Sequence, residues 1–285
     1  MAAMPFGSVL RCLAQEIINK GARMEYTLIT GATGGLGKAF VELCAAQKDN
    51  LLLTGRSAEK LQALRAEILK KHAELDVLIF AADLSKDDSR YALTEWISEK
   101  NVKIKRLINV AGADIQKAFA DYTQEKIAFQ CRATFEGAVS LCHAAIKNKG
   151  ERLEIVNISS VSGIYPMPYF ALYSALKGAL TSFSVSLREE MKGKNVKVTA
   201  VLPGAMPTRA DVKEQIKGQG LWGKLAAKSP AFVAEKSLRA VAKNKRQIIP
   251  GFWNKVMNFG TKLLPLSWKL KFIAKRWSKI SKDAF

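Results

Sequence analysis

The stretch YTLITGATGGLGKAF, from Tyr26 to Phe40, decides the fold of this chain. It opens with a short apolar run of strand-forming residues and passes through a glycine cluster into a helical pattern. Such a turn lets the backbone come close to a phosphate, while the free N–H groups at the helix start point at the same place. A turn that serves packing alone is the other interpretation, but the position between a first strand and a first helix favours phosphate binding.

Strands and helices continue to alternate after this turn. Helical patterns run to about 47, over 57–72 and 86–100, to about 148, and over 169–192. Between them, apolar runs predict strands at 50–54, 76–82, 106–111, 153–159, 196–202 and 246–250. These runs are continuous rather than alternating, so helices should cover both faces of the sheet. We therefore predict an α/β fold: a doubly wound parallel sheet of about seven strands, of the Rossmann type.

The pattern predicts one Rossmann-type catalytic domain over 24–250 with a segment on each side. Residues 1–23 read as an amphipathic appendage and not as a signal peptide, because Arg11, Gln15 and Glu16 interrupt their apolar run. Residues 251–285 read as a basic, helical C-terminal extension. No run of about 18 apolar residues predicts a transmembrane helix.

The positive charge is concentrated in the last third of the chain. The net charge is +20, and residues 192–285 carry 21 Lys and Arg against four acids. Such a field attracts phospholipid, nucleic acid or acidic ligands. Between 266 and 280, apolar residues recur at helical spacing with basic residues over much of the rest: Leu266, Leu270, Ile273, Trp277 and Ile280, against Lys269, Lys275, Arg276 and Lys279. Two interpretations fit: a helix on an anionic membrane surface, or a helix docked on the body or on a second subunit.

The glycine spacing is TGxxxGxG, which resembles the short-chain dehydrogenase/reductase family over about 26–208. NVAG at 109–112 is similar to the family's NNAG, ADLS carries Asp83 where the family has an adenine-contacting acid, and PGAMPT at 203–208 is similar to PGxxxT beside the nicotinamide. The resemblance implies a cofactor site built from Thr30, Gly31, Thr33, Gly35, Leu36, Gly37, Asp83, Asn109, Ala111, Gly112, Pro203, Gly204 and Thr208.

The end of the second strand predicts which nicotinamide cofactor binds. An acid there would bind a ribose 2′-hydroxyl and favour NAD, whereas an arginine would suit the 2′-phosphate of NADP. The strand ends LLLTGRS, with Arg56 and no acid. We therefore predict NADP(H), with a solvated loop arginine as the alternative.

The resemblance also implies the reacting groups: Ser160, Tyr173 and Lys177, the last two from YSALK. Hydride transfer to a carbonyl creates an alkoxide that needs a proton, and alcohol oxidation needs the reverse. Free tyrosine has a pKa of about 10, so it is a poor base at neutral pH. A nearby ammonium and the positive nicotinamide favour the phenolate and should lower this pKa. Lys177 should supply that charge and hold the nicotinamide ribose. Ser160 should donate a hydrogen bond to the substrate oxygen, whereas Ser159 reads as structural.

One position departs from the family pattern. The family usually has a catalytic asparagine in its fourth helix, which holds a water for a proton relay behind the lysine. Alignment of ATFEGAVSLCHAAI puts Thr134 there. A hydroxyl could hold that water less rigidly, so the relay is in question more than the hydride step.

Apolar residues beside the reacting groups suggest an apolar substrate, such as a fatty acyl, steroid or other lipid carbonyl. They are Ile164, Tyr165, Met167, Pro168 and Phe170, and ordinary core packing explains them equally well.

The leading hypothesis is thus an NADP-dependent enzyme that interconverts a carbonyl and an alcohol. The alternatives are a non-catalytic NADP-binding regulatory or scaffold protein on the same fold, and a nucleic-acid-binding protein, for which no recognition motif is present. Four cysteines without metal-ligand spacing and two histidines predict no metal site and a reducing, cytoplasmic setting, with peripheral membrane contact left open. Homo-oligomers are common in the family.

Overall fold

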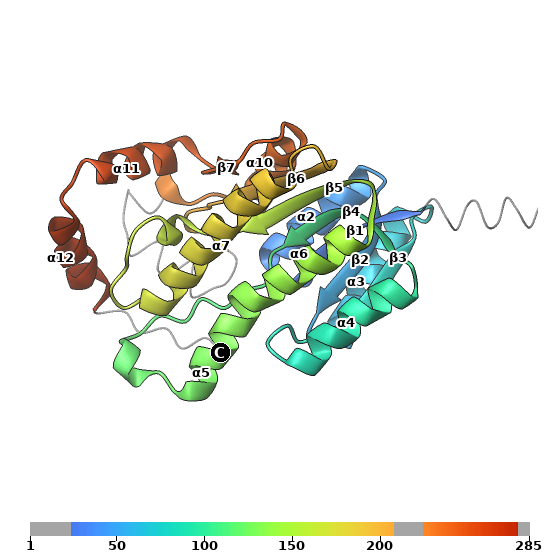
Figure 1. Cartoon of the computed structure of the whole chain (residues 1–285), viewed down its shortest axis with the longest axis horizontal. Coiled ribbons are helices and arrows are strands. Elements are labelled where there is room, and N and C mark those ends of the chain that lie inside the picture. Colours follow the sequence, from blue (N-terminus) through green and yellow to red (C-terminus); the bar gives the residue numbers. More distant parts are fainter. Residues whose placement is uncertain (1–23, 208–224, 279–285) are drawn as a thin grey trace, which may run out of the picture.

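The computed structural model describes residues 24–207 and 225–278, and it forms one seven-stranded parallel sheet with strand order β3-β2-β1-β4-β5-β6-β7 (Figure 1). The strands are β1 (Glu25–Thr30), β2 (Asn50–Gly55), β3 (Val77–Ala81), β4 (Lys103–Asn109), β5 (Lys149–Ile158), β6 (Val196–Val201) and β7 (Gln247–Ile248). The predicted doubly wound fold is confirmed, and the strands lie close to their predicted positions.

Helices cover both faces of the sheet, as the continuous apolar strands require. Alternate strand residues point to opposite faces: Leu51 and Leu53 join one core and Leu52 joins the other. The first core includes α2 (Gly35–Ala46), α3 (Ala58–Lys71) and α10 (Pro230–Ala242). The second includes α4 (Asp87–Glu99), α6 (Gly137–Lys147) and α7 (Ala171–Glu190).

Two predicted elements differ from the observed ones. The expected long helix before 148 is broken into a 3-10 turn η1 (Phe119–Asp121), α5 (Gln124–Cys131), a π turn η2 (Arg132–Glu136) and α6. The last strand pairs over two residues only, at Gln247 and Ile248. Pro250 follows them, and proline has no N–H with which to continue the ladder.

A buried ionic network ties several strands together. Asp49, just before β2, accepts from Thr27 Oγ1 of β1 at 2.8 Å and from Lys105 and Arg106 of β4, each at 2.6 Å. Arg106 also pairs with Glu154 of β5 at 2.9 Å. The network therefore links β1, β4 and β5 to the start of β2.

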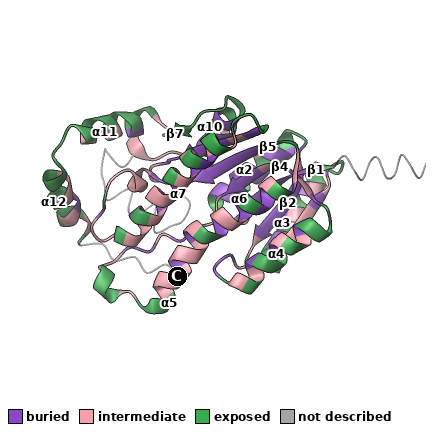
Figure 2. Cartoon of the chain, viewed as in Figure 1, coloured by how far each residue is buried: buried purple, intermediate pink, exposed green. Residues whose placement is uncertain are grey.

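The C-terminal extension forms two helices, α11 (Phe252–Lys262) and α12 (Leu266–Trp277), at the end of the molecule away from β3 (Figure 1). Most of their surface is exposed (Figure 2). Among the described helices, none has the length and hydropathy to cross a membrane.

Candidate functional site

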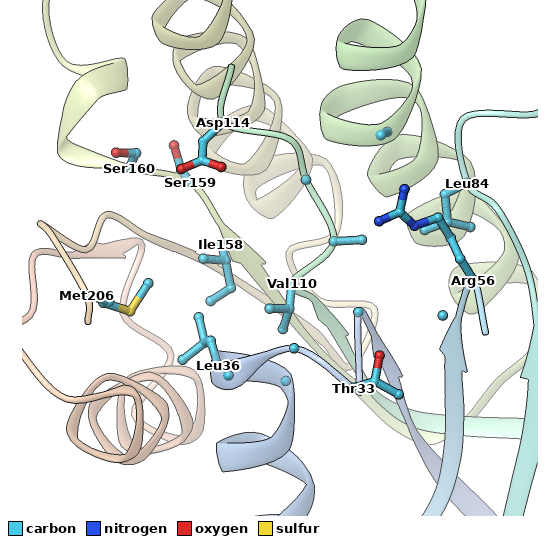
Figure 3. A pocket seen from close by; sticks show the side chains of 18 of the residues that line it. Thr33, Leu36, Arg56, Leu84, Val110, Asp114, Ile158, Ser159, Ser160 and Met206 are labelled. Carbon is cyan, nitrogen blue, oxygen red and sulfur yellow. The ribbon is translucent and has the colours of Figure 1, made fainter. Parts of the chain in front are cut away.

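The largest group of predicted site residues lines one cavity of about 410 Å³ (Figure 3). The strand order reverses between β1 and β4, and ligands of open α/β sheets bind in the crevice at such a switch point. The predicted residues that line the cavity are Gly31, Thr33, Gly35, Leu36, Gly37, Arg56, Asp83, Ala111, Gly112, Ser160, Tyr173, Lys177, Pro203 and Gly204.

The glycine turn leaves no room for side chains. Gly31 has a φ of +61°, and a Cβ there would lie 3.2 Å from the backbone nitrogen of Ala111. A Cβ on Gly37 would lie 2.1 Å from the Gly31 carbonyl oxygen. Helix α2 starts here with no acid in its first turn, so its free N–H groups are suited to an anion. The cradle fits a pyrophosphate.

Arg56 and Thr33 lie at the end of the cavity away from Ser160 (Figure 3). Arg56 follows β2 and is exposed, as a guanidinium that receives a phosphate from solvent should be. Asp83 also lines the cavity, and its Oδ1 accepts from the backbone nitrogen of Ser85 at 3.0 Å and from Ser85 Oγ at 2.7 Å. The carboxylate thus fixes the turn after β3 beside the cavity.

Two predicted cofactor residues lie behind the cavity wall. Thr30 Oγ1 accepts from the backbone nitrogens of Val110 and Ala111 at 2.9 and 3.0 Å. Asn109 Nδ2 donates to Asn157 Oδ1 at 2.8 Å between β4 and β5. Both residues are buried, and both hold the wall in place. Thr208 lies outside the described residues.

Thr134 is also buried, in the π turn η2, a kind of helix irregularity that is frequent at functional sites. Its Oγ1 accepts from the backbone nitrogen of Ala113 at 3.1 Å. A Cβ on Gly112 would lie 3.4 Å from Lys177 Nζ and 3.7 Å from Thr134 Oγ1. The threonine and the lysine therefore flank the same glycine.

The chain places Ser160 and Tyr173 together through a tight helix contact. Ser160 lies two residues after β5 and caps the 3-10 turn η3 (Val161–Gly163), where its Oγ accepts from Ser162 N at 3.1 Å. A Cβ on Gly163 would lie 2.6 Å from the carbonyl carbon of Lys177, so η3 rests directly on α7. Ser159 Oγ donates to the Lys177 carbonyl at 2.7 Å, which agrees with its predicted structural role.

The pKa values of Tyr173 and Lys177 are both shifted from their ordinary values. Burial, and then the charge of Asp114, raises the pKa of Tyr173 above its ordinary value, while a hydrogen bond with Ser160 opposes this rise. Burial lowers the pKa of Lys177 to about 8, and Asp114 opposes that change. Lys177 Nζ donates to the Ile158 carbonyl at 2.8 Å and lies 5.7 Å from the Tyr173 ring centroid. The residues around Tyr173 therefore raise the pKa of its phenol, whereas the lowering by the positive nicotinamide stays a prediction.

Two features of the site were not predicted from the sequence. Asp114 lines the cavity on the same side as Ser160 (Figure 3), although it lies outside every motif. The ring centroids of Phe170 and Tyr173 lie 4.7 Å apart. Trp277 of α12 stacks on Phe170, and their ring centroids lie 6.1 Å apart. Asp114 follows NVAG by two residues, which only weakly predicts that it lines the cavity. Nothing in the local sequence predicts the contact with Trp277.

The apolar residues around Phe170 line a second hollow, of about 510 Å³. Ile164, Tyr165, Met167 and Pro168 line it together with Leu270 of α12. The hollow lies between α7, which carries Tyr173 and Lys177, and the C-terminal extension, so these side chains face a space as well as the core.

A family model described as short chain dehydrogenase matches residues 25–217, more than half of the chain. The chain belongs to the short-chain dehydrogenase family. This family membership agrees with the glycine turn, the serine and the YxxxK pair described above, and it makes the protein an oxidoreductase of the nicotinamide-dependent kind.

Known short-chain dehydrogenases similar to this chain include a dehydrogenase/reductase SDR family protein 7-like from Anopheles gambiae, 29% identical, covering 85% of this chain and 81% of the relative. A very-long-chain 3-oxoacyl-CoA reductase from Bos taurus is 31% identical, covering 65% of this chain and 60% of the relative. A solved short-chain dehydrogenase from Sphingobium yanoikuyae in complex with NADPH is 26% identical with a TM-score of 0.69, covering 84% of this chain and 94% of that one.

Proposed function

We propose that this chain is an NADP(H)-dependent oxidoreductase that interconverts a carbonyl and a secondary alcohol on an apolar, lipid-like substrate. The observation that carries the proposal is the meeting of Ser160, Tyr173 and Lys177 in one cavity with the glycine turn and Arg56. A relative that acts on a very-long-chain 3-oxoacyl-CoA, and the hollow beside Phe170, support the substrate class.

Each residue has a defined part in the reaction. The bound nicotinamide would supply the hydride to the carbonyl carbon. Tyr173 gives its phenolic proton to the carbonyl oxygen, and Ser160 donates a hydrogen bond to that oxygen as its charge grows. Lys177 holds the ribose and returns a proton toward Tyr173. In the oxidation direction Tyr173 removes the hydroxyl proton.

The residues present fit the cofactor from one end of the cavity to the other. The close approach of Gly37 to Gly31 leaves backbone N–H groups for the pyrophosphate, and Arg56 offers a planar fork to a 2′-phosphate. Pro203 and Gly204 line the cavity after β6, where the nicotinamide end would lie.

Substituting Tyr173 tests the reaction. Steroid, acyl-thioester and small ketones would be screened against NADPH oxidation, and the best substrate used for the variants. Tyr173→Phe should reduce kcat/KM by about 10²–10⁴, the usual contribution of a positioned acid, and leave NADPH binding intact. The control is Tyr91→Phe, on the exposed surface of α4. Retained turnover in Tyr173→Phe would contradict the assignment.

The cofactor proposal has its own test. Arg56→Ala should raise the KM for NADPH by roughly ten- to a hundred-fold, the value of a charged hydrogen bond, and should leave the KM for NADH nearly unchanged. Equal losses for both cofactors would contradict a role in phosphate recognition. NADPH binding without turnover of any screened ketone would favour the non-catalytic alternative.

A further inference from the structure

The apolar side chains that face solvent are concentrated on the C-terminal helices. Twelve large apolar residues are exposed in the described part of the chain, and nine of them lie between 252 and 272. They are Phe252, Trp253, Val256, Phe259, Leu263, Leu264, Leu266, Trp268 and Phe272. Exposed apolar side chains gathered in this way on a folded protein mark an interaction surface.

Helix α11 and its C-cap residue Leu263 carry four of these nine residues in one stripe. Phe252, Val256, Phe259 and Leu263 follow the i, i+4, i+7, i+11 spacing of one helix face, and they are 42–74% exposed. Asn254 points to the opposite side and is 3% exposed. Its Nδ2 donates to the carbonyls of Ala226 and Pro250 at 3.0 and 2.9 Å. The helix is thus held by its polar face, and its apolar face is turned outward.

Helix α12 is oriented the other way. Ile273 is buried, Leu270 lines the hollow beside α7, and Trp277 stacks on Phe170. Three residues of the apolar face that the sequence predicted for α12 therefore face the body, whereas Leu266 of the same face is exposed. Two aromatic side chains of the opposite face, Trp268 and Phe272, are exposed and extend the outer surface.

The charge around the patch selects the kind of occupant. Residues 251–278 contain six Lys and Arg and no Asp or Glu. Lys255 and Lys262 lie seven residues apart and flank the α11 stripe along one side. A second copy of this chain would bring like charges together, and a nucleic acid would leave the apolar stripe in water. An anionic membrane has an apolar interior for the stripe and negative headgroups for the basic residues.

We propose that the outer face of α11 and α12 docks on an anionic phospholipid bilayer. The stripe of α11 enters the interface with Trp268 and Phe272, and the lysines reach the headgroups. Because the inner face of α12 walls the hollow beside Phe170, docking holds that hollow next to the bilayer. The attachment is peripheral and requires no membrane-spanning helix.

Co-sedimentation of the full chain with vesicles tests this directly. Vesicles of phosphatidylcholine mixed with phosphatidylserine should bind the protein, vesicles of phosphatidylcholine alone should bind it weakly, and added salt should weaken binding. The triple variant Phe252→Ser, Phe259→Ser, Leu263→Ser should lose binding at least ten-fold. Tyr91→Ser is the matched control, an exposed aromatic on α4. Far-UV circular dichroism of each variant verifies that it is folded.

A charge pair gives a second, independent arm. Lys255→Glu with Lys262→Glu should weaken binding to the mixed vesicles, whereas Lys60→Glu with Lys70→Glu on α3 should weaken it less. Failure of the wild type to bind mixed vesicles, or equal binding by the triple variant, would overturn the proposal. A change from dimer to monomer in the triple variant would instead assign the face to contact between copies. Vesicle binding needs no turnover, so this test and that of the proposed reaction fail separately.

Discussion

At the scale of single residues, the charge of Asp114 influences both of the proposed reacting groups, Tyr173 and Lys177. After burial, its negative charge is the main influence that raises the pKa of Tyr173, and it favours the charged form of Lys177. Asp114→Asn should therefore lower the pKa of both groups. In the oxidation direction the acidic limb of the kcat/KM profile should move to lower pH, because the phenolate forms more easily. Asp121→Asn, on the exposed turn η1, is the control. An unmoved limb, or a shift to higher pH, would contradict the assignment.

Thr134 supports the wall behind the lysine. Its hydroxyl is the acceptor for the buried backbone nitrogen of Ala113. Thr134→Val keeps the shape and removes that acceptor, so the free energy of unfolding should fall by about 1–3 kcal/mol in urea titration. Thr134→Ser should recover most of the loss. Equal stability of the valine variant and the wild type would show that the hydroxyl is not needed for the wall.

At the scale of elements, the contact of η3 with α7 sets the position of Ser160 relative to Tyr173. Gly163→Ala would press a methyl group against the backbone of Lys177 and Gly178, at 2.6 Å from each. The turn must then move away from the helix, and kcat should fall at least ten-fold through lost geometry. Gly260→Ala, where nothing lies within 4 Å, should leave kcat unchanged. If both variants keep wild-type kcat, the contact does not position the serine.

The elements also show what the sequence could predict. Buried parallel strands give continuous apolar runs, so β1 to β6 were located closely, and motifs at their carboxyl ends meet because parallel strands end at one edge. The π turn at 132–136 leaves no trace in periodicity, because it shifts the ladder by one residue inside an amphipathic pattern. Asp114 and Trp277 reach the site through loop course and helix docking, which depend on tertiary packing rather than on local spacing.

At the scale of the whole molecule, the network around Asp49 should govern stability. Asp49 is buried and pairs with Lys105 and Arg106, so Asp49→Asn leaves cations without their buried partner. The free energy of unfolding should fall by on the order of 3 kcal/mol, measured by urea titration. Asp88→Asn, exposed in the first turn of α4, should cost less than about 1 kcal/mol. Comparable losses in the two variants would show that the network contributes no more than a surface charge.

The ring contact between Phe170 and Trp277 has a consequence for biosynthesis. The two residues are more than a hundred positions apart, so the tryptophan leaves the ribosome about 5–20 s after the phenylalanine at ordinary rates. Strands β1 to β5 precede Phe170 in the chain, and helix α7 and strand β6 are made in the meantime. The nascent chain can therefore assemble its nucleotide-binding half before Trp277 is available to pack on Phe170, which in turn contacts Tyr173.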